Sequence, residues 1–322
     1  MPESLWTVAS QVIVLFVLIA LGVFCTRAHL FKEQFISGLT SFVLTFVTPC
    51  NIITSFQRDF DSGLLGGLLI SFGAAFVFNL ICLGLSVLTI RSKDPAKRRV
   101  LRFATMFSNC GYMALPLEEA VLGSIGVFFG ATYVAVSHMF IWTSGIYMLS
   151  GDRKQVSARK LVTCPPLIAV AVGLVFFFTS TELPTVIAKP ISLIGSMNTT
   201  LPMLIIGYYL ARADLGRMFK TASLYVSLAV RLVVSPLLVV LGMRFVVSPL
   251  LASLGTELGS LAGPIMVAGT IAFAAPTAVI TTMLAGRYGQ DTELSAGAVS
   301  LSTILSIVTM PLIITLSQYL AG

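Results

Sequence analysis

The chain has 322 residues, of which 57% are hydrophobic and only 10% are charged. An ordinary soluble domain carries about 25% charged residues, so this composition excludes a water-soluble fold. The formal charge of +7 does not indicate a nucleic-acid partner, because the basic residues cluster at the ends of apolar runs. The sequence therefore predicts an all-α membrane protein with several transmembrane helices.

Ten apolar runs follow one another along the chain, each close to the roughly 20 residues that cross a bilayer as a helix. No Lys or Arg precedes the first run, so we interpret it as a retained helix and not as a secretory signal. The ten expected transmembrane spans cover residues 8–26, 36–56, 63–90, 101–121, 124–150, 161–180, 186–210, 221–247, 261–285 and 293–318.

The basic residues are distributed unevenly over the loops between these spans. With the N-terminus outside, 16 of the 20 Lys and Arg residues fall on one side, Arg217 and Lys220 among them. The positive-inside rule makes that side cytoplasmic, so both termini are expected to be extracytoplasmic. Arg231 stands inside the eighth span, either to attract an anion or, as we slightly favour, to extend back toward the basic interface.

The two halves of the chain resemble each other. Pro49 and Pro202 occupy matching places in the second and seventh spans, and Pro116 and Pro276 do so in the fourth and ninth. Five spans per half is an odd number, so the second copy must insert in the opposite orientation. Inverted repeats with interrupted helices are typical of secondary transporters. The expected units are a first repeat at 1–150, a short cytoplasmic linker at 151–160 and a second repeat at 161–322.

The fourth and ninth spans are predicted to be broken. A proline inside a helix removes a backbone hydrogen bond, so Pro116 should free the carbonyl of Tyr112 and Pro276 that of Ala272. If both breaks cross near the membrane centre, the half-helix N-termini present amides and a positive dipole end to a carboxylate. The alternative is a pair of kinks used only for packing.

Polar side chains near these breaks are the candidate ligands. We rank Asn109 and Tyr112 first, with a cap on the broken helix as the less favoured alternative for Asn109. Asn51 and Asn198 either face the same cavity or bond between helices. His138 either carries a proton or satisfies a helix–helix hydrogen bond.

The remaining ionisable and sulfur groups suggest no further chemistry. Glu118 and Glu119 follow Pro116 and are expected at the outer end of the broken helix, where carboxylates stay solvated. No acidic cluster lies deep in a span, so coupling to a proton or to sodium stays open. The five cysteines show no CxxC or Cys/His spacing, and we expect no disulfide, metal or other cofactor.

Four motifs together resemble the auxin efflux carrier family over nearly the whole chain. They are Asn-Cys-Gly-Tyr-Met-Ala-Leu-Pro-Leu at 109–117, Ala-Pro-Thr-Ala-Val at 275–279, Leu-Ala-Gly-Arg-Tyr-Gly at 284–289 and Leu-Ser-Thr-Ile-Leu-Ser-Ile-Val-Thr-Met-Pro at 301–311. Two departures matter. Plant members have a more polar asparagine–proline motif, so auxin itself is not implied, and the loop at 151–160 is too short for a long regulatory insert.

The resemblance implies ten helices in an inverted five-plus-five repeat, similar to the bile acid symporter architecture, with spans four and nine crossing. It implies a scaffold of spans 1, 2, 6 and 7, often dimerising, and a moving transport domain of spans 3–5 and 8–10. The substrates of such a family are small carboxylates such as malate, malonate or indole acetate. Together with the residue patterns, it gives as candidate substrate ligands Asn109, Gly111, Tyr112, Pro116, Ala275, Pro276, Thr277, Asn51 and Asn198, with His138 and Trp142 weaker.

The sequence therefore predicts a secondary transporter of small organic anions in the plasma or inner membrane, working by elevator-type alternating access. Its expected partners are the carboxylate, membrane lipids and a second copy bound through the scaffold, with no nucleic acid. Two other classes stay open. An intramembrane enzyme on lipid-like substrates would need clustered Asp, His or Cys groups at one face; a channel or sensor of the same architecture would share every motif.

Overall fold

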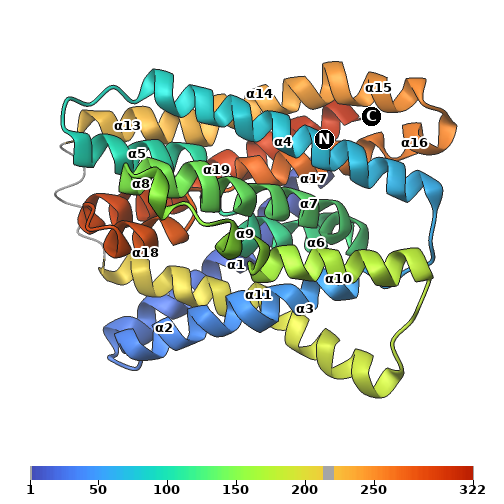
Figure 1. Cartoon of the computed structure of the whole chain (residues 1–322), viewed down its shortest axis with the longest axis horizontal. Helices are drawn as coiled ribbons and strands as arrows, with labels where there is room; N and C mark the ends of the chain where they lie inside the picture. Colours follow the sequence, from blue (N-terminus) through green and yellow to red (C-terminus); the bar gives the residue numbers. More distant parts are fainter. Residues whose placement is uncertain (1, 213–220, 322) are drawn as a thin grey trace.

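The computed structural model describes residues 2–212 and 221–321, which form helices joined by short loops (Figure 1). Arg217 and Lys220, counted among the cytoplasmic basic residues, lie outside this described part. Within it, eight helical segments are long and apolar enough to cross a membrane. They are Ala9–Arg27, Glu33–Phe56, Ser62–Thr89, Ser124–Ser150, Arg153–Thr179, Thr185–Arg212, Ala222–Ser253 and Thr292–Ala321.

Several of these segments combine α-helices with short π-helical or 3-10 turns, and these short turns carry the label η. In the first half of the chain the elements are α1 Pro2–Arg27, α2 Glu33–Phe42, η1 Val43–Val47, α3 Thr48–Phe56, α4 Ser62–Thr89, α5 Pro95–Met106, η2 Cys110–Ala114, α6 Leu115–Leu122, α7 Ser124–Phe140, η3 Ile141–Gly145 and α8 Ile146–Ser150. In the second half they are η4 Arg153–Gln155, α9 Ala158–Val162, α10 Pro165–Thr179, α11 Thr185–Arg212, α13 Ala222–Ala229, η5 Val230–Val234, α14 Ser235–Gly242, η6 Met243–Val247, α15 Ser248–Ser253, α16 Thr256–Ser260, α17 Ala262–Ala274, α18 Ile280–Arg287 and α19 Thr292–Ala321.

Four π-helical turns share one position relative to a proline. η1, η2, η5 and η6 end two residues before Pro49, Pro116, Pro236 and Pro249 respectively. A proline cannot donate to the carbonyl four residues earlier and collides with it in a regular α-helix, and a wider π turn removes that collision. Each of these helices therefore continues through its proline. Pro116 accordingly stands inside a continuous η2–α6 helix, and the chain unwinds before it.

The expected fourth and ninth spans each consist of two helices separated by an unwound segment. One break lies between α5 and η2, and the other lies between α17 and α18, where Pro276 stands. The two breaks meet as a short antiparallel pair: the Asn109 amide donates to the Pro276 carbonyl at 2.7 Å, and the Ala278 amide donates to the Phe107 carbonyl at 3.0 Å. Backbone groups released by one break are thus satisfied by the other, as an apolar environment requires.

Arg231 connects the helix ends that point toward this pair. Its side chain is 0% exposed, and its guanidinium donates to the carbonyl of Met106 at 2.9 Å and to the carbonyl of Phe273. These carbonyls belong to the last turns of α5 and α17, where helix carbonyls lack partners and carry partial negative charge. The expectation that Arg231 extends back to the membrane surface is therefore wrong, because two helix C-termini bind it in the interior.

The helices pack as two groups. α1 packs along α11, and α3 packs against α10 and α11. In the other group α7 packs against α4 and α17, and α17 packs against α14 and α19. In Figure 1, α2, α3, α10 and α11 lie along the lower side and α4, α13, α14 and α15 along the upper side. The α1–α11 contact is close because Gly22 and Gly207 face each other: a Cβ on Gly207 would lie 2.3 Å from the Ile19 carbonyl oxygen.

Candidate functional site

A small cavity of about 40 Å³ lies beside the paired breaks, between the two groups of helices. Side chains from η1, α3 and α10 form one wall, and residues of η2, α7, η3 and α18 form the other. This volume accommodates a few water molecules. The lining residues are Leu44, Thr48, Ser108, Asn109, Cys110, Gly111, Tyr112, His138, Ile141, Pro166, Ala278, Ile280 and Met283.

Asn109 is the polar residue closest to both breaks. It precedes η2 directly, and its backbone amide is held by Pro276, yet its side chain makes no capping hydrogen bond. The side-chain nitrogen Nδ2 has no hydrogen-bond partner although the residue is only 5% exposed. The cap interpretation of Asn109 therefore does not hold, and its amide is available to a molecule in the cavity.

Gly111, Tyr112 and His138, which are also candidate ligands, line the cavity as well. The Tyr112 hydroxyl, like the Asn109 amide, has no hydrogen-bond partner. The Nδ1 atom of His138 lies 2.9 Å from the Val134 carbonyl of its own helix, so this contact joins no second helix. Two unpartnered polar groups and one imidazole therefore meet at the cavity.

The residues predicted around the second break shape the cavity without lining it. Ala275 and Thr277 are fully buried. The Thr277 amide donates to the Ser302 hydroxyl at 3.0 Å, and its hydroxyl donates to the Ala104 carbonyl at 3.1 Å. Pro276 offers its carbonyl to Asn109. These bonds fix the unwound backbone in place.

The other predicted residues lie farther out. Asn198 accepts a hydrogen bond from the Thr48 hydroxyl at 2.8 Å, and Thr48 itself lines the cavity. Asn51 lies next to Glu119, and Trp142 next to the thiol of Cys164. Pro116 lines a separate cavity of about 240 Å³, together with Gln11, Val14, Leu15, Leu117, Glu119, Ala120 and Thr199.

The electrostatics of the site come from the backbone. None of its lining residues is Lys, Arg, Asp or Glu. The N-terminal ends of η2 and α18 open onto the cavity, and such ends carry about half a positive charge each. The C-terminal ends of α5 and α17 are occupied by Arg231. The arrangement favours an anion at the cavity. In the described residues no group of three or more His, Cys, Asp or Glu side chains is suited to bind a metal, and all five cysteines are free.

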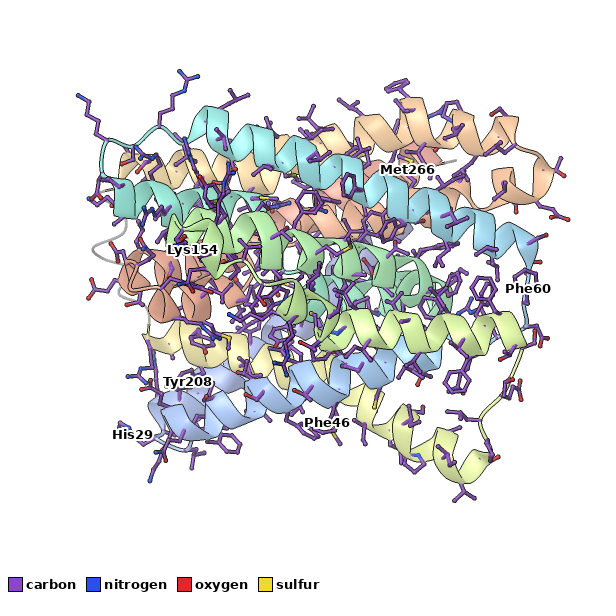
Figure 2. The ribbon with its side chains drawn as sticks, viewed as in Figure 1. His29, Phe46, Phe60, Lys154, Tyr208 and Met266 are labelled. Atoms are coloured by element: carbon purple, nitrogen blue, oxygen red, sulfur yellow. The ribbon has the colours of Figure 1, made fainter. Side chains whose placement is uncertain are left out.

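A larger cavity of about 440 Å³ adjoins the site, and Met283 lines both. It contains Tyr208, Tyr209 and the exposed Arg212–Glu33 ion pair, whose charged atoms are 3.5 Å apart. Figure 2 shows Tyr208, His29 and Lys154 toward the same end of the molecule, with Phe60 at the opposite end.

The two groups of helices contact each other at the Phe60 end. Arg58, which follows α3, donates to the Ser124 carbonyl of α7 at 3.1 Å, and its guanidinium lies 4.6 Å from the centre of the Phe128 ring. The Phe56 and Phe128 rings pack with their centres 4.7 Å apart. These contacts join the two groups toward the Phe60 end, whereas the larger cavity, which Tyr208 lines, adjoins the site through Met283.

Sequence reasoning missed several residues of the site. Ser108 and Thr48 adjoin Asn109 and Pro49, so proximity to a recognised motif was a usable signal. Met283 had no such signal, because an apolar residue in an apolar run does not indicate which residues it contacts in the fold. Glu118, expected to be solvated, is only 1% exposed. That expectation is wrong, because α7 covers its side chain.

Comparison with known proteins identifies the family of the chain. A family model described as "Membrane transport protein" matches residues 7–314. The chain belongs to this family, the auxin efflux carriers that its motifs resemble. An uncharacterized transporter from Methanothermobacter thermautotrophicus is 26% identical over 308 residues, which cover 92% of this chain and 94% of that protein. This auxin efflux carrier family member is thus a transporter and not an enzyme, and a multi-pass protein of the cell membrane.

Proposed function

We propose that this protein is a secondary transporter of small organic carboxylates that binds its substrate at the Asn109 cavity. The observation that carries the proposal is the unpartnered Asn109 amide at a cavity onto which two half-helix N-termini open. Amide donors and positive dipole ends stabilise a carboxylate without a lysine or arginine in the site. The free Tyr112 hydroxyl supplies a further donor.

The proposal includes ten transmembrane spans in an inverted repeat, with both termini extracytoplasmic. The pairs α5–α6 and α17–α18 serve as the fourth and ninth spans, each broken at the centre. The eight continuous segments supply the others. The recurring prolines and the distribution of basic residues support this arrangement.

Alternating access in this proposal is of the elevator type. The group containing α1, α3, α10 and α11 is the scaffold, through which two copies associate, and the group around α7 and α17 moves with the bound substrate. The contact of Arg58 with α7 supports a closed outer side, and the larger cavity beside Met283 supports access from the cytoplasm. Because the site itself measures about 40 Å³, its walls must separate to admit a carboxylate.

The test is uptake of radiolabelled malate, malonate, lactate and indole acetate into proteoliposomes. Proton, sodium and voltage gradients are imposed one at a time. Counterflow, in which unlabelled acid inside drives labelled acid inward, separates a carrier from a channel or sensor. Failure of every acid to exchange, in protein shown to be folded, would overturn the proposal.

Asn109→Ala tests the site. A hydrogen bond to a charged group contributes about 1.5–3 kcal/mol, so transport efficiency should fall by about 10- to 100-fold. The matched control is Asn79→Ala, since Asn79 is also buried but donates to the Ala75 carbonyl within α4 at 2.9 Å. Equal transport by both variants would remove Asn109 from the site.

A further inference from the structure

Glu118 is a buried carboxyl group that the proposed substrate site does not use. It lies in α6, the half-helix that continues from η2, and its residue is 1% exposed. Neither carboxyl oxygen has a hydrogen-bond partner, and the salt bridge found in the described residues joins Arg212 to Glu33. An ionised carboxylate in such a place is strongly disfavoured, so this geometry fits a group that holds a proton.

The space around Glu118 is created by glycines of α7. A Cβ on Gly130 would lie 1.7 Å from Oε2 of Glu118, so the carboxyl group rests directly on the bare Cα of this glycine. One turn earlier, a Cβ on Gly126 would lie 2.3 Å from the Glu118 carbonyl oxygen. A larger side chain at either position would displace Glu118. The burial of the carboxyl group is therefore built into the α6–α7 contact.

Few titratable groups surround this carboxyl. η2 supplies the Cys110 thiol and α7 the Tyr133 phenol, both within electrostatic range. The Tyr133 hydroxyl is buried without a hydrogen-bond partner and lies near the Ser71 hydroxyl of α4. α17 has no titratable residue, and α1 and α11 carry theirs only near their ends. Within the described part of the chain, no cation neutralises Glu118.

The oxygen atoms nearby suit a proton better than a metal ion. A sodium ion needs several oxygen ligands, whereas the side-chain groups within electrostatic range of this carboxyl in the described residues are the Tyr133 phenol and the Cys110 thiol. A proton needs a single oxygen, and the neutral acid that results is tolerated in a low-dielectric interior. Buried carboxyl groups in transporters are typically parts of proton pathways.

We infer that Glu118 binds the proton that couples transport to a proton gradient. The inference rests on the proposed carrier function and extends it to the driving ion. Asn109 and Glu118 stand on one continuous half-helix, about 13 Å apart by helix rise. Substrate and proton therefore travel together on the moving group. Protonation neutralises Glu118, so the loaded group carries only the single charge of a bound monocarboxylate. After the acid and the proton leave on the other side, the empty group returns with the single charge of the Glu118 carboxylate in its place.

The decisive variant is Glu118→Gln, which keeps the shape and removes the titration. In the wild type, a gradient of one pH unit should drive up to about tenfold accumulation of the acid per coupled proton. E118Q should lose this accumulation while retaining counterflow. The matched control is Glu119→Gln, because Glu119 is the neighbouring residue and is exposed. The E119Q protein should accumulate the acid as the wild type does. Gradient-driven accumulation by E118Q equal to the wild type would overturn the inference.

Infrared difference spectroscopy across the pH range supplies a readout that needs no substrate. The wild type should show the carbonyl stretch of a protonated carboxylic acid, which disappears in E118Q and persists in E119Q. If no acid exchanges in the wild type, the proposed function fails while this band still tests Glu118. If E118Q does not fold, Glu118→Asp serves instead, because it retains a carboxyl group and should shift the pH at which the band changes. If the band of this variant changes at the same pH as that of the wild type, Glu118 is not its source.

Discussion

Replacing Arg231 by methionine should destabilise the protein more than any other single arginine substitution in its membrane core. Arg231→Met removes the guanidinium that joins the C-terminal ends of α5 and α17 and leaves the carbonyls of Met106 and Phe273 unpaired. Each of these helix ends carries about half a negative charge, so the two together match one guanidinium. The loss should therefore separate the two broken helices where their breaks pair.

The magnitude follows from those contacts. A hydrogen bond to a charged group contributes about 1.5–3 kcal/mol, which gives about 3–6 kcal/mol for the bonds to the two helix ends. Removing the charge also removes part of the cost of burying it, so the net loss in unfolding free energy should be about 3–5 kcal/mol. Arg231→Lys keeps the charge but lacks the planar fork that reaches both ends, and should lose about half as much.

Unfolding by SDS in mixed micelles, followed by the fluorescence of Trp6 and Trp142, measures this change. The control is Arg244→Met, because Arg244 is exposed on the neighbouring η6 segment and should change the unfolding free energy by less than about 0.5 kcal/mol. If R231M unfolds at the same SDS fraction as the wild type, the electrostatic account of the paired helix ends is refuted.

The same unfolding assay tests two contacts of the scaffold group. Gly207→Ala should cost about 1–3 kcal/mol, because the new Cβ would lie 2.3 Å from the Ile19 carbonyl oxygen and force α1 and α11 apart. Gly84→Ala, where nothing lies within 4 Å of the added atom, is the control and should be nearly neutral; equal losses in both variants would contradict this reasoning. Asn198→Ala removes the acceptor of the Thr48 hydroxyl and should cost about 1–2 kcal/mol, and an unchanged stability would show that this bond is dispensable.

The part of the site predicted from the sequence is the part marked by local chemistry. Asn109, Gly111 and Tyr112 stand in one motif beside a helix break, and the cavity includes all three. The position of the break was less predictable. Pro116 was expected to interrupt its helix, whereas the π turn of η2 accommodates it and the chain unwinds before Asn109. A proline removes a donor wherever it stands, but packing decides whether the helix widens or opens.

The sequence by itself determined the class of the protein, because apolar runs of bilayer length leave the backbone no choice but helices within lipid. The sequence also determined the family, because the motifs and their order along the chain suffice to recognise it. Only the tertiary structure decided the roles of the buried charges. Arg231 bonds to the ends of two helices at Met106 and Phe273, which are 125 and 42 residues away from it along the chain. Glu118 is covered by α7, where Gly126 and Gly130 leave room for it. Burial and partners depend on which helices pack together, and no local pattern specifies that.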